Sequence, residues 1–82
     1  MKTYIMALKD AKLGVYGQPQ AVQSPGLGAR AFEDAQNDPE RKTDISKHPE
    51  DFSLWQLATY DDETGLFENN KPHLIMQGKQ NV

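Results

Sequence analysis

Apolar and polar positions alternate over several stretches of the chain, and this pattern predicts short β-strands. Residues 2–9 contain Thr3, Tyr4 and Ile5, which favour extended backbone, and apolar side chains fall on both faces of the segment. This predicts a strand in the middle of a sheet rather than at its edge. Residues 52–60 are apolar on both faces in the same way and give the strongest strand pattern. Shorter extended segments are predicted at 15–16, 21–23, 66–68 and 73–77.

One helix is predicted between the extended segments. Ser24 can accept a hydrogen bond from the amides of a first helical turn, and Pro25 suits the first helical position. Pro39 cannot continue a helix and biases the residue before it to extended angles, so the helix covers about 25–37. The apolar positions that recur at helical spacing, and that predict one apolar face, are Leu27, Ala31, Phe32 and Ala35.

The other segments are predicted as loops and turns. Residues 40–47 are polar and mixed in charge, which predicts an exposed loop. Residues 48–51 can form one helical turn, with Pro49 at its first position. The acidic segment 61–65 lies between two predicted strands, and Gly65 supplies the positive φ that such a hairpin loop commonly needs. Its spacing does not fit a calcium loop, so we interpret it as a turn. The alternatives are a contact with a protein partner and a metal or catalytic site formed by its carboxylates.

Together these elements predict an α+β fold, in which a small antiparallel sheet of three to five strands has the helix packed on one face. The 82 residues are expected to form a single domain over 1–82, with 78–82 as a flexible tail. A chain of this length buries only about 60% of the surface that its unfolded form exposes. Only 37% of the residues are hydrophobic, so we expect a homo-oligomer, a dimer or higher, or docking on a larger partner to add buried surface.

The charge balance and the composition exclude several classes of protein. Nine basic residues stand against twelve acidic ones, which gives a formal net charge of −3. Because Lys and Arg supply most of the affinity for DNA phosphates, binding to nucleic acid would depend on a local cluster of cations. The lack of cysteine excludes disulfides and thiolate zinc sites. The sequence shows no secretory signal and no apolar run that could span a bilayer, so we expect a soluble intracellular protein.

No group of residues matches a catalytic or metal-binding motif. His48 and His73 are the two histidines, and they lie far apart in the sequence without HxH or HExxH spacing. The serines lack the strained turn that exposes a nucleophilic serine. The glycine pair in residues 26–30 lacks the third glycine of a dinucleotide site and the lysine of a P-loop. We therefore expect a protein that is not an enzyme and holds no metal or other cofactor.

Aromatic residues on predicted strands are the more informative candidates. Tyr4, Tyr16, Trp55 and Tyr60 lie on or beside these strands, and aromatic rings on a sheet face can stack on unpaired bases. The same rings can instead form the core, since a chain poor in apolar residues needs its large ones inside, or an oligomer interface. The cations early in the chain that can line such a face are Lys2, Lys9, Lys12 and Arg30.

Two segments carry a resemblance to a known family. ARAFEDAQNDP at 29–39 is a helix that ends in Asn-Asp-Pro, and KHPEDFSLWQLATYDDETG at 47–65 joins a His-Pro-Glu-Asp element to a strand that closes in Asp-Asp-Glu-Thr-Gly. With these motifs, residues 3–70 resemble the small nonstructural protein of gokushoviruses, which are single-stranded-DNA phages of the Microviridae. The helix start at 26–28 and the residues at 59–60 depart mildly from the family pattern.

The resemblance implies a non-enzymatic DNA-binding protein in the cytoplasm of the bacterial host, acting in the switch from double-stranded replication to single-stranded genome synthesis. We expect it to prefer single-stranded DNA. The alternative is an adaptor that binds the phage initiator or a host replication protein without contacting DNA, through the acidic turn and Glu50-Asp51. On physical grounds, the predicted DNA contacts are Lys2, Lys9, Lys12, Arg30, Arg41, Lys42 and Lys47 for phosphates, with Tyr16 and Trp55 for stacking.

Overall fold

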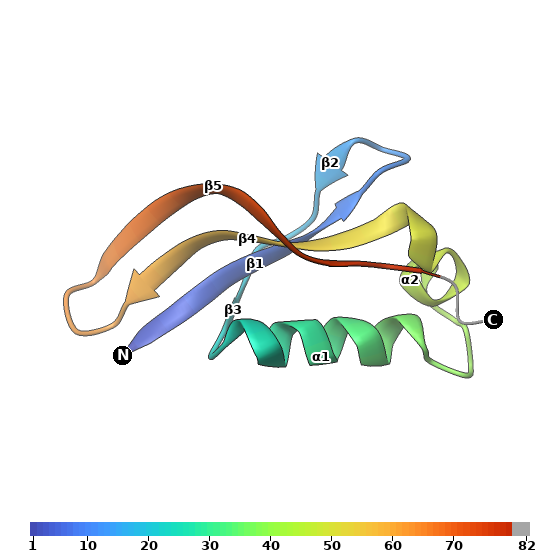
Figure 1. Cartoon of the computed structure of the whole chain (residues 1–82), viewed down its shortest axis with the longest axis horizontal. Coiled ribbons are helices and arrows are strands. Elements are labelled where there is room, and N and C mark those ends of the chain that lie inside the picture. Colours follow the sequence, from blue (N-terminus) through green and yellow to red (C-terminus); the bar gives the residue numbers. More distant parts are fainter. Residues whose placement is uncertain (80–82) are drawn as a thin grey trace.

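The structure, a computed structural model, describes residues 1–79. It contains one curled antiparallel sheet of five strands, and the main helix lies along one face of this sheet (Figure 1). The predicted α+β class and helix are therefore confirmed. The elements are β1 (Lys2–Asp10), β2 (Val15–Tyr16), β3 (Gln20–Val22), α1 (Pro25–Gln36), α2 (Asp44–Lys47), the 3₁₀ turn η1 (Pro49–Asp51), β4 (Phe52–Asp61) and β5 (Leu66–Gln77).

Strand β1 occupies the middle of the sheet, as its two apolar faces predicted. The strand order is β2-β1-β4-β5, and β3 pairs with the same edge of β1 as β2. The end of β1 at Lys9 and Asp10 pairs with β2, and the segment from Tyr4 to Met6 pairs with β3. Two short strands thus cover one edge of β1, and the long strand β4 covers the other.

Strand β5 is one continuous edge strand where the sequence predicted two short ones. Eight of its twelve residues pair with β4, and the register shifts twice, between Leu54 and Trp55 and between Gln56 and Ala58. Pro72 lies inside the second irregularity, and proline is tolerated at an edge or a bulge because it has no amide to donate to the ladder. The proline therefore interrupts the pairing locally without ending the strand.

The core lies between α1 and the sheet. Met6 of β1, Phe32 of α1, Ile45 of α2 and Leu54 of β4 form the buried cluster. Gly28 brings the helix close to β1, because a Cβ at this position would lie 2.6 Å from the Sδ of Met6. The helix begins as predicted, since the Ser24 hydroxyl accepts a hydrogen bond of 3.2 Å from the Leu27 amide.

The apolar face predicted for the helix is wrong in part. Phe32 is buried, but Leu27 is 52% exposed and Ala31 and Ala35 are also exposed. The physical reason is the close approach at Gly28, which turns the row of Gly28 and Phe32 toward the sheet. Leu27, Ala31 and Ala35 are left on the flank of the helix.

The exposed loop predicted at 40–47 is also wrong, because residues 44–47 form α2. Thr43 and Ser46 cap this turn reciprocally: each side-chain oxygen accepts a hydrogen bond from the backbone amide of the other residue. The turn buries Ile45 in the core. This cap is a capping box with serine in place of the usual glutamate, and that signal was missed in the sequence.

The described part of the predicted tail is held against the body. The Gly78 amide donates a 2.9 Å hydrogen bond to the Phe52 carbonyl, and the Lys79 amide donates one of 3.2 Å to Oε1 of Gln36. Gly78 is buried, and a Cβ there would collide with the carbonyl oxygen of Pro49. The rest of the predicted tail, residues 80–82, lies outside the described residues.

Candidate nucleic-acid interface

The sheet has one face covered by α1 and one open face. Side chains of adjacent residues along a strand point to opposite faces, and residues paired across strands share a face. Met6 and Leu54 contact the helix, so their neighbours Ala7 and Trp55, which pair with each other, point to the open face. By the same register the open face carries Lys9, Tyr16, Ser53, Trp55, Leu74, Tyr60 and Phe67.

Lys9, Tyr16 and Trp55 form a compact group on this open face, which we call the Lys9 cluster. The Tyr16 and Trp55 rings meet edge to face, with centroids 6.2 Å apart and planes at 86°. The Lys9 Nζ lies over both, 5.3 Å from the Tyr16 centroid and 5.6 Å from the Trp55 centroid. The group therefore places a cation over two aromatic rings, and its three residues come from three different strands.

The surroundings of the Lys9 cluster keep its rings accessible but fixed. Trp55 is half-buried, and its Nε1 donates a 2.7 Å hydrogen bond to the Oγ of Ser53, which orients the indole. Tyr16 is 38% exposed. Tyr4, by contrast, packs against the buried cluster on the helix side. The structure thus separates the predicted aromatic candidates: Tyr4 belongs with the core, whereas Tyr16 and Trp55 belong to the open face.

A second aromatic pair lies on the same face, near the hairpin that joins β4 and β5. The Tyr60 and Phe67 rings have centroids 4.9 Å apart. Phe67 is 62% exposed, and the neighbouring Leu66 is 67% exposed. Figure 1 shows this hairpin extending beyond the first turn of α1. The open face therefore has an aromatic group toward each end.

The other predicted phosphate contacts lie in separate parts of the molecule. Lys2 starts β1, seven residues from Lys9 and thus about 23 Å away at 3.3 Å per residue. Arg30 is exposed on α1, in the layer behind the sheet. Lys12 lies in the turn after β1, Arg41 and Lys42 lie between the two helices, and Lys47 ends α2.

Two of these cations have contacts near the helices. Lys42 forms an exposed ion pair of 3.4 Å with Glu40. Arg41 donates a hydrogen bond of 3.4 Å to the carbonyl of Lys47 and adopts a positive φ of 52°. The structure therefore brings Lys9 together with the two predicted stacking residues, and it does not bring all seven cations onto one surface.

The acidic segment 61–65 forms the hairpin turn that the sequence predicted. Gly65 has φ 73°, and the Asp61 carboxylate accepts a 2.9 Å hydrogen bond from the Glu63 amide. The Met1 ammonium donates a 2.7 Å hydrogen bond to the Asp62 carboxylate and also lies 3.8 Å from Asp61. The bond to Asp62 raises the pKa of the Met1 ammonium above its usual 8.0.

One group in the described chain has the composition of a metal site. Ligand atoms of His48, Glu50 and Asp51 lie within 4.8 Å of one another at η1. This triad was not predicted from the sequence, where His48 was paired only with His73. His48 and Glu50 are exposed, and exposed acidic groups are common without an ion, so the triad by itself assigns no metal.

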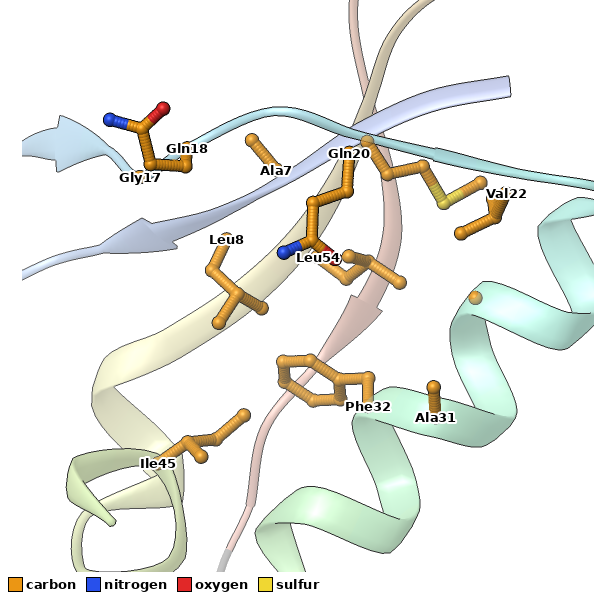
Figure 2. Close-up of a pocket in the computed structure, with 12 residues that line it drawn as sticks. Ala7, Leu8, Gly17, Gln18, Gln20, Val22, Ala31, Phe32, Ile45 and Leu54 are labelled. Atoms are coloured by element: carbon orange, nitrogen blue, oxygen red, sulfur yellow. The ribbon is translucent and has the colours of Figure 1, made fainter. Parts of the chain in front are cut away.

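A small apolar cavity lies between α1, β1 and β3 (Figure 2). Its volume is about 210 Å³. Figure 2 shows the Phe32 ring directed from the helix toward the sheet, with Ala31 on the same helix beside it. Sequence reasoning gave no indication of this cavity, because it depends on how far the helix stands from the short strand β3.

Fold and site together define a small α+β protein whose open sheet face carries aromatic rings and a cation. Residues 3–81 match the family model of the phage ORF5 protein, so the chain belongs to this family of phage proteins. Comparisons with curated proteins and with solved structures gave no match. Over residues 1–79, no helix is both long enough and apolar enough to cross a membrane.

Proposed function

We propose that this phage protein is a non-enzymatic DNA-binding protein that holds single-stranded DNA on the open face of its sheet. The observation that carries the proposal is the Lys9 cluster, in which a lysine lies over the Tyr16 and Trp55 rings. Aromatic rings on a sheet stack on bases, at about 1–3 kcal/mol for each base, and a neighbouring cation neutralises a phosphate. Single strands fit this arrangement because their bases are free to stack.

The charge of the chain shapes the kind of binding that we propose. With a formal net charge of −3, the protein has no overall attraction for a polyanion. Affinity then comes from stacking and from the few cations close to the rings, Lys9 above all. We therefore expect moderate binding that weakens as salt is raised, with a shallow salt dependence because few phosphates are neutralised.

The proposed role is the switch from double-stranded replication to single-stranded genome synthesis in a gokushovirus of the Microviridae, within the cytoplasm of the bacterial host. Membership of a phage family supports the phage setting. The motifs at 29–39 and 47–65 support the gokushovirus assignment through the resemblance given above. A protein that covers newly made single strands prevents their conversion to duplex, and such a switch requires that effect.

Fluorescence anisotropy with a labelled oligothymidine, at low and raised salt, tests this proposal. The unchanged chain should bind at low salt and bind a duplex of the same length more weakly. Tyr16→Ala removes one stacking ring, so its affinity should fall between about 5-fold and about 150-fold. Leu66→Ala is the control, because it removes an exposed apolar side chain that belongs to the turn end of the β4–β5 hairpin.

Two results would overturn the proposal. One is the absence of any binding by the unchanged chain at low salt. The other is a Tyr16→Ala variant that binds as tightly as the unchanged chain while circular dichroism shows both to be folded.

A second candidate function is an adaptor that binds the phage initiator or a host replication protein without contacting DNA. The observation that favours it is the hairpin end, where exposed Leu66 and Phe67 lie beside the acidic residues 61–63. Apolar side chains next to charges are typical of protein-binding surfaces. A pull-down that survives nuclease treatment and is lost in Phe67→Ala, together with no DNA binding, would favour the adaptor.

A further inference from the structure

Helix α1 carries an apolar stripe that the described chain leaves uncovered. Leu27, Ala31 and Ala35 follow at four-residue spacing, so they form one row along the helix. All three are exposed, Leu27 by 52%. The neighbouring row, Gly28 and Phe32, is buried against the sheet. The stripe therefore extends the apolar core onto the surface of the molecule.

The apolar cavity adjoins this stripe. Ala31 belongs to both (Figure 2). The cavity wall also includes Met6, Phe32 and Leu54 of the core. Pockets for small-molecule ligands usually measure about 300–1,000 Å³. The cavity, at about 210 Å³, is smaller and suits apolar side chains from a surface that lies on the stripe.

The outer border of the stripe carries charges of both signs. Arg30 and Asp34 lie one helical turn apart, and both are exposed. Among residues 1–79, the ion pairs involve neither of them. When two copies pack around a two-fold axis, a contact from one residue to another occurs twice. In an antiparallel pair of α1 helices with this axis near residue 32, each Arg30 therefore meets the Asp34 of the other copy.

We propose that α1 forms a homodimer interface, in which the helices of two copies pack antiparallel along Leu27, Ala31 and Ala35. The two alanines allow the helix axes to approach closely, and the second copy closes the mouth of the cavity. A second copy is the occupant because the border of the stripe is complementary to itself. The proposal does not rest on DNA binding, since the stripe and the Lys9 cluster belong to opposite sides of the sheet.

Light scattering after size exclusion, over a range of protein concentrations, tests the proposal on the full chain. The unchanged chain should have the mass of a dimer, and Leu27→Asp should have the mass of a monomer at the same concentration. An acidic residue in the first turn of a helix is favourable, so this variant should fold. Leu66→Asp is the matched control, because Leu66 is 67% exposed but lies on the β4–β5 hairpin, outside the stripe. It should remain a dimer.

A charge exchange tests the proposed geometry. Arg30→Asp places two acids opposite each other in the antiparallel pair, and Asp34→Arg places two bases opposite each other. Each single variant should dissociate at concentrations where the unchanged chain is a dimer. The double variant restores opposite charges across the interface and should regain the dimer mass. If positions 30 and 34 pair only within their own helix, the double variant regains thermal stability but keeps the mass of a monomer.

Three results would overturn the proposal. The first is an unchanged chain that stays monomeric up to about 1 mM, which corresponds to an association free energy weaker than about 4 kcal/mol. The second is a dimer that survives Leu27→Asp. The third is a double charge exchange that stays monomeric when both single variants are monomeric and folded.

Discussion

Aromatic side chains on the two sides of the sheet have opposite surroundings. On the face that α1 covers, Phe32 is 4% exposed and packs with Met6 and Leu54. On the open face, Phe67 is 62% exposed and Tyr16 is 38% exposed. A chain with few apolar residues loses stability when it leaves large rings outside the core. The covered ring therefore contributes to the core, whereas the open-face rings stay accessible to another molecule.

Replacing a phenylalanine by alanine should change stability far more on the covered face than on the open face. Phe32→Ala removes a buried ring and should lower the free energy of unfolding by about 3–5 kcal/mol. Phe67→Ala removes an exposed ring and should lower it by only about 0.5–1.5 kcal/mol, through its lost pairing with Tyr60. Urea unfolding followed by circular dichroism measures both. Equal losses would show that the open face contributes to the core.

The next effect concerns how closely the helix approaches the covered face. Gly28→Ala places a Cβ 2.6 Å from the buried Met6 Sδ, and this overpacking should cost about 1–3 kcal/mol of stability, offset in part by the up to about 1 kcal/mol that alanine gains over glycine in a helix. Gly26→Ala is the matched control in the same helix, since nothing lies within 4 Å of its Cβ position. Gly26→Ala should raise stability by up to about 1 kcal/mol, because alanine favours helix. Similar thermal midpoints for the two variants would contradict the close contact.

A smaller effect is expected on DNA binding at the open face. Lys9→Gln removes a cation that can pair with a phosphate and should weaken binding by about 2–5-fold, the equivalent of about 0.5–1 kcal/mol, as for an exposed ion pair. It should also reduce the slope of log affinity against log salt by about 0.7, as expected for one phosphate contact to a single strand. Lys42→Gln removes the same charge from a lysine already paired with Glu40 and should bind almost as the unchanged chain does. Equal losses would show that net charge, rather than the Lys9 cluster, controls affinity.

The smallest effect concerns the hairpin end of the sheet. Because the pKa of the Met1 ammonium is raised by its hydrogen bond to Asp62, its contribution to stability is fully present below pH 8.0. That contribution is lost as the pH rises through the higher pKa of the folded state. Asp62→Asn removes the main partner. The difference in urea midpoint between the unchanged chain and this variant should therefore shrink from about pH 7 to about pH 10, across the range in which α-amino groups titrate. A constant difference would contradict the contact.

Local signals in the sequence were sufficient for most of the fold. The Ser24-Pro25 pair fixed where α1 begins, and the apolar positions of 2–9 and 52–60 indicated β1 and β4. These signals depend on interactions between residues close in the sequence, and the same interactions are present in the folded chain. The cap formed by Thr43 and Ser46 is equally local, but serine in place of glutamate made it easy to miss.

The candidate site was predictable only as separate residues. Lys9, Tyr16 and Trp55 were each named from the sequence, but their contact depends on the register of β1 with β2 and with β4. A shift of one residue would send Trp55 to the covered face. The exposed stripe on α1 was missed for a related reason, because helical spacing does not reveal which apolar row meets the sheet.

The proposed binding of single-stranded DNA to the open face of the sheet can be tested directly. Trp55 is the single tryptophan of the chain, so its emission reports on that face without a label. Titration with an oligothymidine at low salt should quench Trp55 fluorescence in a saturable way, and raised salt should reverse the quenching. If anisotropy detects binding of the same oligonucleotide while Trp55 emission stays unchanged, the DNA lies elsewhere and the claim is wrong.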